Sequence, residues 1–252
     1  MKRLFQRLVS PSLRLWLKLI LRFLGDVRSG RSLHIVRSRK PDQSQSPKFE
    51  PRVNVVQVLK VANYSENKRQ NLTIAANHIH NVVIQPDEIF SFWALVGAPV
   101  AKRGYLEGRA LVNGKLKAVM GGGLCQLSGI LYYLMLQAGL EPIERYPHST
   151  DIYTDETRFT PLGSDATVVY GYKDLRFINS LSQPICFRID LEADRITGEL
   201  CTLDPIVTYC IEFRTTQKTD GHCTEVETLR SPTMSNAENQ MEFQPIGLSC
   251  YR

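Results

Sequence analysis

Three consecutive glycines in the middle of the chain lead into a segment that is apolar on almost every side. Its apolar positions recur every three or four residues, the spacing of a helix: Leu127, Ile130, Leu131, Leu134 and Met135. Gly139 follows at a position where glycine commonly ends a helix. A helix that is apolar all round must be covered by other elements. The sequence therefore predicts a buried central helix around which one domain is built.

The segments on either side of this helix show helical and strand-like patterns. Apolar spacing predicts a helix over residues 71–81. Short apolar runs bounded by turn residues predict strands at 82–84, 89–93, 166–170, 175–178, 185–189 and, more weakly, 206–213. Asn113-Gly114 lies between two strand-like runs and predicts a hairpin. We therefore expect an α+β fold, in which a mixed or antiparallel sheet packs on the buried central helix.

Changes in composition divide the chain into four regions. We expect a basic amphipathic helix at 1–27, a linker at 28–52, the main domain at 53–205 and a C-terminal extension at 206–252. Hydrophobic residues make up 43% of the 252 residues, which is enough to bury a core. The net charge of +6 is concentrated in the first 40 residues, where Asp26 is the only acid. The remainder is close to neutral, so no nucleic-acid surface is expected.

The N-terminal segment combines basic and apolar residues. Five basic residues share one narrow face of a helix: Arg3, Arg7, Arg14, Lys18 and Arg22. Charges interrupt every apolar run, and no clear signal peptide is present. Two interpretations remain open: residues 1–24 rest on an anionic membrane surface, or the helix packs on the protein with its basic side in solvent. We therefore expect a cytoplasmic protein or one peripheral at the cytoplasmic membrane.

The chain has six cysteines, and none forms a Cys-x-x-Cys pair or has a histidine at zinc-finger spacing. We expect no metal and no cofactor, and mostly free thiols, although one or two disulfides are compatible with the spacing. The alternative is a structural metal site in the C-terminal part, formed by several of Cys186, Cys201, Cys210 and Cys223.

Cys125 follows the glycines and opens the predicted buried helix. Glycines at Gly121, Gly122 and Gly123 allow positive φ angles and close approach of a substrate. A helix N-terminus offers unpaired N–H groups and partial positive charge, which favour a thiolate and a developing oxyanion. These properties suit a cysteine nucleophile. A glycine-rich turn before an inert, buried thiol is the alternative.

A nucleophilic thiolate also needs a base and a group that orients it. His148 is the best-placed histidine, because it lies where the chain returns from the central helix. Asp165 begins a predicted strand and is the candidate to orient His148. Gln126 and Ser149 are candidates to bind substrate beside the glycines, and Ser91 and Ser128 are further polar lining residues. The remaining histidines have no comparable context: His34, His78, His80 and His222.

Taken together, these stretches resemble the VanW family over about residues 55–205. The most specific stretch is Gly121-Gly122-Gly123-Leu124-Cys125-Gln126-Leu127-Ser128. The other similar stretches are 71–81, 86–92, 96–97, 104–105, 138–140, 143–145, 148–149, 163–168 and 174–179. The ordered set is much more specific than any one of its parts.

The resemblance implies a role in peptidoglycan metabolism and glycopeptide resistance, because some members act as L,D-transpeptidases. It implies that Cys125 attacks a carbonyl of a peptidoglycan stem peptide or precursor and forms a thioester. His148 would be the base, and N–H groups of Gly122, Gly123 and Cys125 would line the oxyanion site. Two hypotheses follow. One is a cysteine acyltransferase or related hydrolase, and the other is a non-catalytic accessory that binds a cell-wall precursor or a membrane partner.

Overall fold

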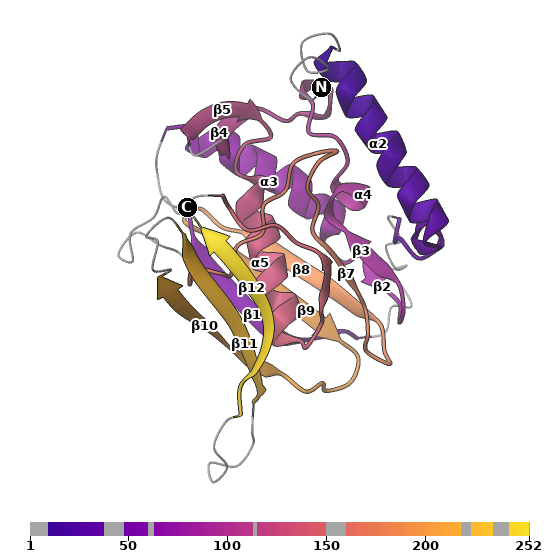
Figure 1. Ribbon diagram of the computed structural model, residues 1–252, viewed down its shortest axis with the longest axis vertical. Coiled ribbons are helices and arrows are strands. Elements are labelled where there is room, and N and C mark those ends of the chain that lie inside the picture. The colour runs from indigo at the N-terminus through magenta and orange to yellow at the C-terminus, as the bar shows by residue number, and fades with distance from the viewer. Residues whose placement is uncertain are drawn as a thin grey trace.

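Helix α5 (Leu124–Gln137) runs through the middle of the protein (Figure 1). The computed structural model describes residues 10–37, 48–59, 63–112, 115–149, 160–217, 223–233 and 242–251. Ten of the fourteen residues of α5 are buried, as its apolar sequence predicts. Gly139 has a φ of +76°, the left-handed conformation in which glycine ends helices. The predicted α+β fold is confirmed, because helices and several sheets form one body.

The described strands form four sheets, and every named pair of neighbouring strands is antiparallel. The largest sheet has the order β1-β9-β8-β2, and its strands are β1 (Glu50–Val58), β9 (Arg195–Thr202), β8 (Ile185–Leu191) and β2 (Val83–Ile84). A second sheet consists of β10 (Tyr209–Gln217), β11 (Thr224–Pro232) and β12 (Gln244–Tyr251). A third has the order β3-β7-β6, with β3 (Ile89–Ser91), β7 (Arg176–Ile178) and β6 (Pro142–Glu144). The predicted hairpin is the fourth: β4 (Glu107–Val112) and β5 (Lys115–Met120).

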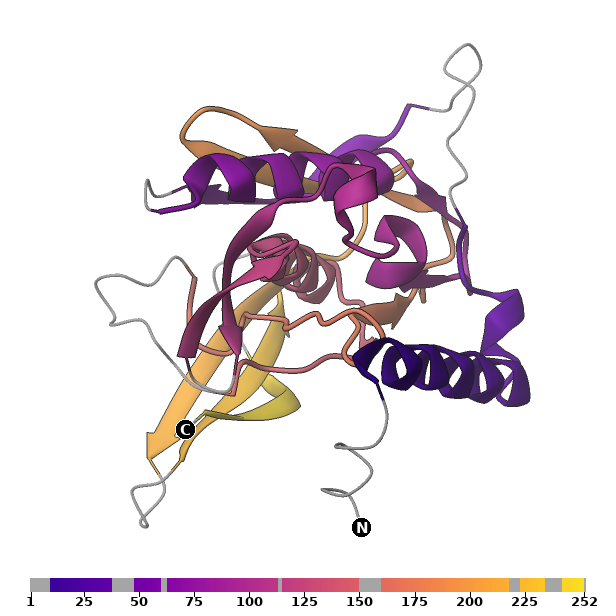
Figure 2. The same ribbon diagram turned by 90° about the horizontal axis from the view of Figure 1, so that it is seen from above.

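Helix α5 is covered from several sides. Helix α3 (Ser65–Ile79) confirms that a helix lies in the region predicted at 71–81, although it begins six residues earlier and ends at Ile79. It packs against α5 and β8. Strands β1, β9 and β10 also contact α5. Figure 2 shows α5 nearly end-on, with α3 on one side and the β10–β12 sheet on the other. Gly198 of β9 faces α5 so closely that a Cβ there would lie 2.6 Å from Ile130 Cγ2.

Two predicted strands differ from the structure. The strand predicted at 89–93 ends at Ser91, because the Ser91 hydroxyl accepts a hydrogen bond from the N–H of Ala94 and caps α4 (Phe92–Val96). Residues 166–170 form an irregular extended segment rather than a strand of a sheet. The carbonyl of Ala166 accepts from Ser128 of α5 at 2.6 Å, the N–H of Thr167 donates to the carbonyl of Tyr146, and Val169 forms an isolated bridge with Lys173, so these residues join no sheet.

The N-terminal helix α2 (Pro11–Arg28) lies on the outside of the body (Figure 2). Ser10 caps its first turn and Pro11 occupies the first helical position, where proline costs no hydrogen bond. Arg22 points toward the body rather than toward solvent, since it pairs with Glu144. Residues 1–9 of the predicted helix lie outside the described residues. None of the described helices is long and apolar enough to cross a membrane.

The predicted linker at 28–52 contains a short 3₁₀ turn, η1 (Arg31–Leu33), and the start of β1. Its residues 38–47 lie outside the described residues. A second 3₁₀ turn, η2 (Ala101–Arg103), precedes β4.

The hairpin β4–β5 leads into α5 through the turn Gly121–Gly123, and Gly122 crosses the backbone of Gly108 in β4. A Cβ on Gly122 would lie 2.0 Å from the carbonyl oxygen of Gly108. We therefore expect Gly122→Ala to lower the free energy of unfolding by about 2–3 kcal/mol or more, because two backbones would have to move apart. The measurement is the midpoint of urea unfolding.

Gly25→Ala is the matched control, since a Cβ at Gly25 in α2 meets nothing within 4 Å. Alanine is favoured over glycine in a helix by about 0.5–1 kcal/mol, so this variant should be as stable as the parent or slightly more so. Equal unfolding midpoints for the two variants would contradict the packing described for Gly122.

Candidate active site

Cys125 is the second residue of α5 and is half-buried at the end of the glycine turn. Gly121 and Gly123 have φ angles of +72° and +101°, so both need the left-handed conformation that glycine adopts easily. The thiol of Cys125 lies 3.8 Å from the carbonyl oxygen of Val168, which belongs to the irregular segment after Asp165. The turn therefore places a partly accessible thiol at a helix N-terminus, as the sequence predicts.

The N–H groups of the glycine turn have different partners. Gly121 donates to Leu106 and Gly122 donates to Val119, both at 3.0 Å. The N–H groups of Gly123 and Cys125 have no acceptor among the residues that the structure describes. The N–H of Gly122 is therefore already engaged, because it closes the turn after β5. Gly123 and Cys125 remain as donors for an oxyanion at this end of the helix.

His148 and Asp165 meet beside the thiol. His148 Nδ1 donates to Asp165 Oδ2 at 2.5 Å, and the backbone N–H of His148 donates to the same oxygen at 2.6 Å. The Cys125 thiol is close enough to the His148 imidazole to contribute to the raised pKa of His148. The structure thus brings the three predicted residues into one contiguous arrangement, in the order thiol, imidazole, carboxylate.

The electrostatics of this arrangement favour the charged forms of His148 and Asp165. Burial opposes protonation of His148, but hydrogen bonds to Asp165 and Cys125 and their negative charges raise the pKa of His148 to about 10. Burial likewise opposes ionisation of Asp165. The hydrogen bond from His148 and the charge of Arg145 nevertheless lower the pKa of Asp165 to about 2. An imidazolium therefore stands next to the thiol at neutral pH.

Two residues that the sequence did not suggest hold Asp165 in place. Arg145, which follows β6, donates to Asp165 Oδ1 at 3.2 Å and to the Asp165 carbonyl at 2.8 Å. The hydroxyl of Tyr251, near the end of β12, donates to the same Oδ1. Burial and the charge of Asp165 raise the pKa of Tyr251, so the phenol remains a donor. In the sequence, Arg145 belongs to the stretch 143–145 that resembles the VanW family, but no pattern assigns it a role. No sequence pattern indicates Tyr251.

Arg145 is itself fixed from several directions. Its guanidinium donates to the carbonyl of Gly163 at 2.8 Å and to the hydroxyl of Ser249 in β12. It also lies over the ring of Tyr132 in α5, 4.7 Å from the ring centroid. The side chain is only 8% exposed, so these contacts replace water around a buried charge.

The other predicted substrate-binding residues lie in different surroundings. Gln126 donates to Gln57 of β1 at 3.1 Å, and Ser149 is exposed immediately after His148. Ser128 bonds to the carbonyl of Ala166, and Ser91 donates to Asp174 at 2.7 Å. Ser128 also donates to the carbonyl of Cys125 at 3.2 Å, so both serines have partners within the protein, and Ser128 bonds to the backbone of the nucleophile candidate itself.

Lys68 of α3 is a further residue near the turn that the sequence did not single out. Its side chain lies so close to Gly123 that a Cβ there would be 2.5 Å from Lys68 Cγ. Burial and the charge of Arg109 lower the pKa of Lys68.

The cysteines other than Cys125 do not form the alternative metal site. Cys223 forms a disulfide with Cys250, while Cys186, Cys201 and Cys210 are free. Within the described residues, no group of three or more His, Cys, Asp or Glu side chains is arranged to hold a metal ion.

The pKa of His148 is directly testable. We expect the His148 imidazole to titrate at about 10, and Asp165→Asn to bring this value back toward the ordinary 6.5, because the carboxylate stabilises the imidazolium. Because the folded state binds this proton more tightly than the unfolded state, protonation of His148 adds to the free energy of unfolding. This contribution is fully present below pH 6.5 and is lost as the pH rises through about 10. The measurement is NMR of the ring protons, assigned with His148→Gln. Ordinary titration near 6.5 in the parent protein would contradict the arrangement.

Comparison with known proteins places this geometry in a family. The family described as VanW like protein matches residues 67–201, which is more than half of the chain. An uncharacterized protein, YoaR, of Bacillus subtilis (strain 168) is 36% identical over 124 residues, which cover 49% of this chain and 39% of that protein. The vancomycin B-type resistance protein VanW of Enterococcus faecalis (strain ATCC 700802 / V583) is 34% identical over 137 residues, which cover 54% of this chain and 50% of that protein.

The chain thus spans half or less of the length of these two relatives. No solved structure matches it. The matched region contains Cys125, His148 and Asp165 but ends before Tyr251. On the extent of this match, the chain belongs to the VanW like protein family.

Proposed function

We propose that the protein is a cysteine acyltransferase of the L,D-transpeptidase kind, acting on a peptidoglycan stem peptide or a precursor of it. The observation that carries the proposal is the hydrogen bond between His148 and Asp165, formed beside a half-buried Cys125 that contributes to the raised pKa of His148. A structural histidine needs no such surroundings, whereas acyl transfer to a cysteine needs an imidazole beside the sulfur, oriented by a third group, that gives up and takes back a proton.

The first step is the attack of the Cys125 thiolate on a peptide carbonyl of the stem. A bond forms between Sγ and the carbonyl carbon, and the oxyanion points toward the N–H groups of Gly123 and Cys125. The C–N bond to the leaving residue then breaks. The departing amine takes its proton from His148, whose Nδ1 is held by Asp165, which leaves Nε2 to serve the reaction. The product is a thioester on Cys125.

The second step returns the enzyme to its starting state. An amine of a second stem attacks the thioester carbonyl, and its proton passes to His148. The Sγ–C bond breaks, the thiolate leaves, and a new amide joins the two stems. Water in place of the amine would give hydrolysis by the same route, so access of the acceptor decides between cross-linking and cleavage.

The family supports the cell-wall part of this proposal. The relative from Enterococcus faecalis is a vancomycin B-type resistance protein, and vancomycin resistance concerns the cell wall. The shared region includes the whole glycine turn, Cys125, His148 and Asp165.

A stem-peptide substrate tests the proposal directly. We expect the full chain, incubated with a disaccharide-tetrapeptide, to gain the mass of an acyl group on Cys125 and then to release cross-linked dimers. Cys125→Ala should abolish both signals, because Cys125 is the free thiol that lies beside the His148–Asp165 pair. Intact-protein mass spectrometry measures the adduct, and chromatography of the muropeptides measures the product.

Cys210→Ala is the matched control, because Cys210 is also a free, half-buried cysteine but lies on β10. It should keep the adduct and the product. Undiminished cross-linking by Cys125→Ala would overturn the proposal. Binding of the stem peptide without any adduct would favour the non-catalytic accessory protein instead.

The reactivity of Cys125 gives a second test that needs no substrate. We expect iodoacetamide to alkylate Cys125 at neutral pH at least about tenfold faster in the parent than in His148→Gln, because the imidazolium favours the reactive thiolate. Peptide mapping over time measures the rate at each cysteine. Cys210 serves as the internal reference, and its rate should not change. Equal rates at Cys125 in the two proteins would contradict an activated thiol.

A further inference from the structure

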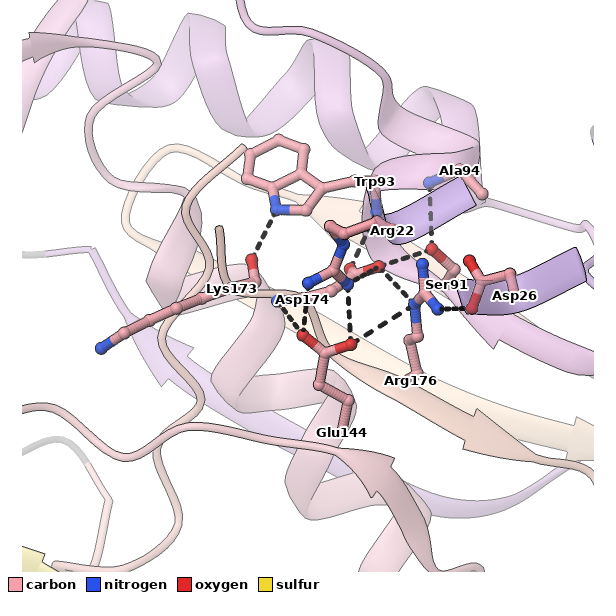
Figure 3. Close-up of polar contacts among 9 residues, drawn as sticks. All are labelled: Arg22, Asp26, Ser91, Trp93, Ala94, Glu144, Lys173, Asp174 and Arg176. Atoms are coloured by element: carbon pink, nitrogen blue, oxygen red, sulfur yellow. Dashed lines mark hydrogen bonds and ion pairs between the residues drawn. The ribbon is translucent and has the colours of Figure 1, made fainter. Parts of the chain in front are cut away.

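Ion pairs fix how the N-terminal helix α2 is turned about its own axis. Arg22 of α2 forms a bidentate pair with Glu144 of β6, at 2.9 and 2.7 Å (Figure 3). One turn further along, Asp26 accepts from Arg176 of β7 at 2.7 Å. The exposed fraction of each of these side chains is 24% or less, so the pairs are largely shielded from water. The charged side of α2 therefore faces the protein.

The partners of α2 are held by a buried network of their own. Arg176 also donates to Asp174 at 2.9 Å, and Asp174 accepts from Ser91 and from the N–H of Trp93 (Figure 3). Beside the ion pairs, Leu15 and Leu19 pack on Gly171, where a Cβ would lie 2.4 Å from Leu15 Cδ1. The helix is thus fixed by charge and by close apolar contact along the same side.

The opposite side of α2 is exposed and apolar. Seven large hydrophobic residues on α2 are each between 36% and 62% exposed: Leu13, Trp16, Leu17, Leu21, Phe23, Leu24 and Val27. At 100° per residue they lie within one broad arc of the helix, opposite Arg22 and Asp26. An exposed apolar stripe of this size on a protein surface indicates an interaction site.

The charges around this stripe are positive. Residues 10–37 contain six basic residues and one acid, Asp26, which is paired with Arg176. Lys18, Arg28 and Arg31 are exposed at the edge and the C-terminal end of the helix. Two copies of the chain meeting through α2 would bring these like charges together. An anionic lipid surface instead complements both the apolar side chains and the basic ones.

We propose that α2 docks on an anionic lipid membrane, lying in the plane of the interface with Trp16 and the exposed leucines inserted. An ordinary surface helix of a soluble protein packs its apolar side on the protein and exposes its charged side. In α2 the side with Arg22 and Asp26 faces the protein, and the apolar side is exposed and available to contact lipid. The docking does not depend on the chemistry at Cys125.

Vesicle binding by the full chain tests the proposal. We expect the protein to co-sediment with vesicles of phosphatidylcholine and phosphatidylglycerol, and less with pure phosphatidylcholine, with binding that weakens as salt screens the basic residues. The triple variant Leu17→Gln, Leu21→Gln and Leu24→Gln should bind at least about tenfold more weakly, since it removes apolar area that the lipid would bury. Glutamine keeps the helix propensity close to that of leucine.

The matched control carries Val207→Gln and Leu248→Gln, which are 60% and 67% exposed on other parts of the surface. It should bind vesicles like the parent. Trp16 gives a separate readout: anionic vesicles should shift the tryptophan emission to the blue in the parent, and Trp16→Phe should remove this shift. Equal binding by parent and triple variant, or dimerisation through α2 in ultracentrifugation without vesicle binding, would overturn the proposal.

Discussion

The burial of helix α5 is the constraint around which the protein is arranged. A helix that is apolar on almost every side is stabilised in proportion to the apolar area that other elements cover. Sheet strands, α3 and the β10–β12 sheet therefore cover it from different directions. Four of its residues remain partly exposed, and two of them, Cys125 and Gln126, lie in its first turn beside the glycines. The packing that buries α5 therefore also determines how far the thiol of Cys125 is exposed.

The carboxylate of Asp165 joins parts of the chain that are far apart in sequence. It accepts hydrogen bonds from His148, from Arg145 and from Tyr251, which lies 86 residues after it. Neither the family match nor the glycine turn includes Tyr251. The charged state of the imidazole beside Cys125 thus depends on the C-terminal sheet as well as on the central region. A fragment limited to the matched region would lack one donor to the carboxylate.

The sequence predicted local features better than contacts between distant segments. Helix α5, helix α3, the hairpin and the order of Cys125, His148 and Asp165 follow from spacing and turn residues. Residues 166–170 form a short apolar run that predicts a strand, but their backbone bonds to Ser128, Tyr146 and Lys173 rather than to a sheet. Which side of α2 faces the protein was not predictable either, because apolar periodicity divides a helix into two faces without indicating which one packs on the rest of the chain. Arg22 and Glu144 decide this, and they are 122 residues apart.

Because Gly122 contacts Gly108, a glycine at position 122 in a related sequence does not by itself indicate that the relative is catalytically active. A glycine at this position is required by two backbones that cross, whether or not the neighbouring thiol reacts. Selection for a folded hairpin alone would keep it unchanged in relatives that have lost their chemistry. A glycine kept at position 122 would therefore indicate packing rather than chemistry. In relatives that had lost the activity, we would instead expect substitutions at the positions of His148 and Asp165.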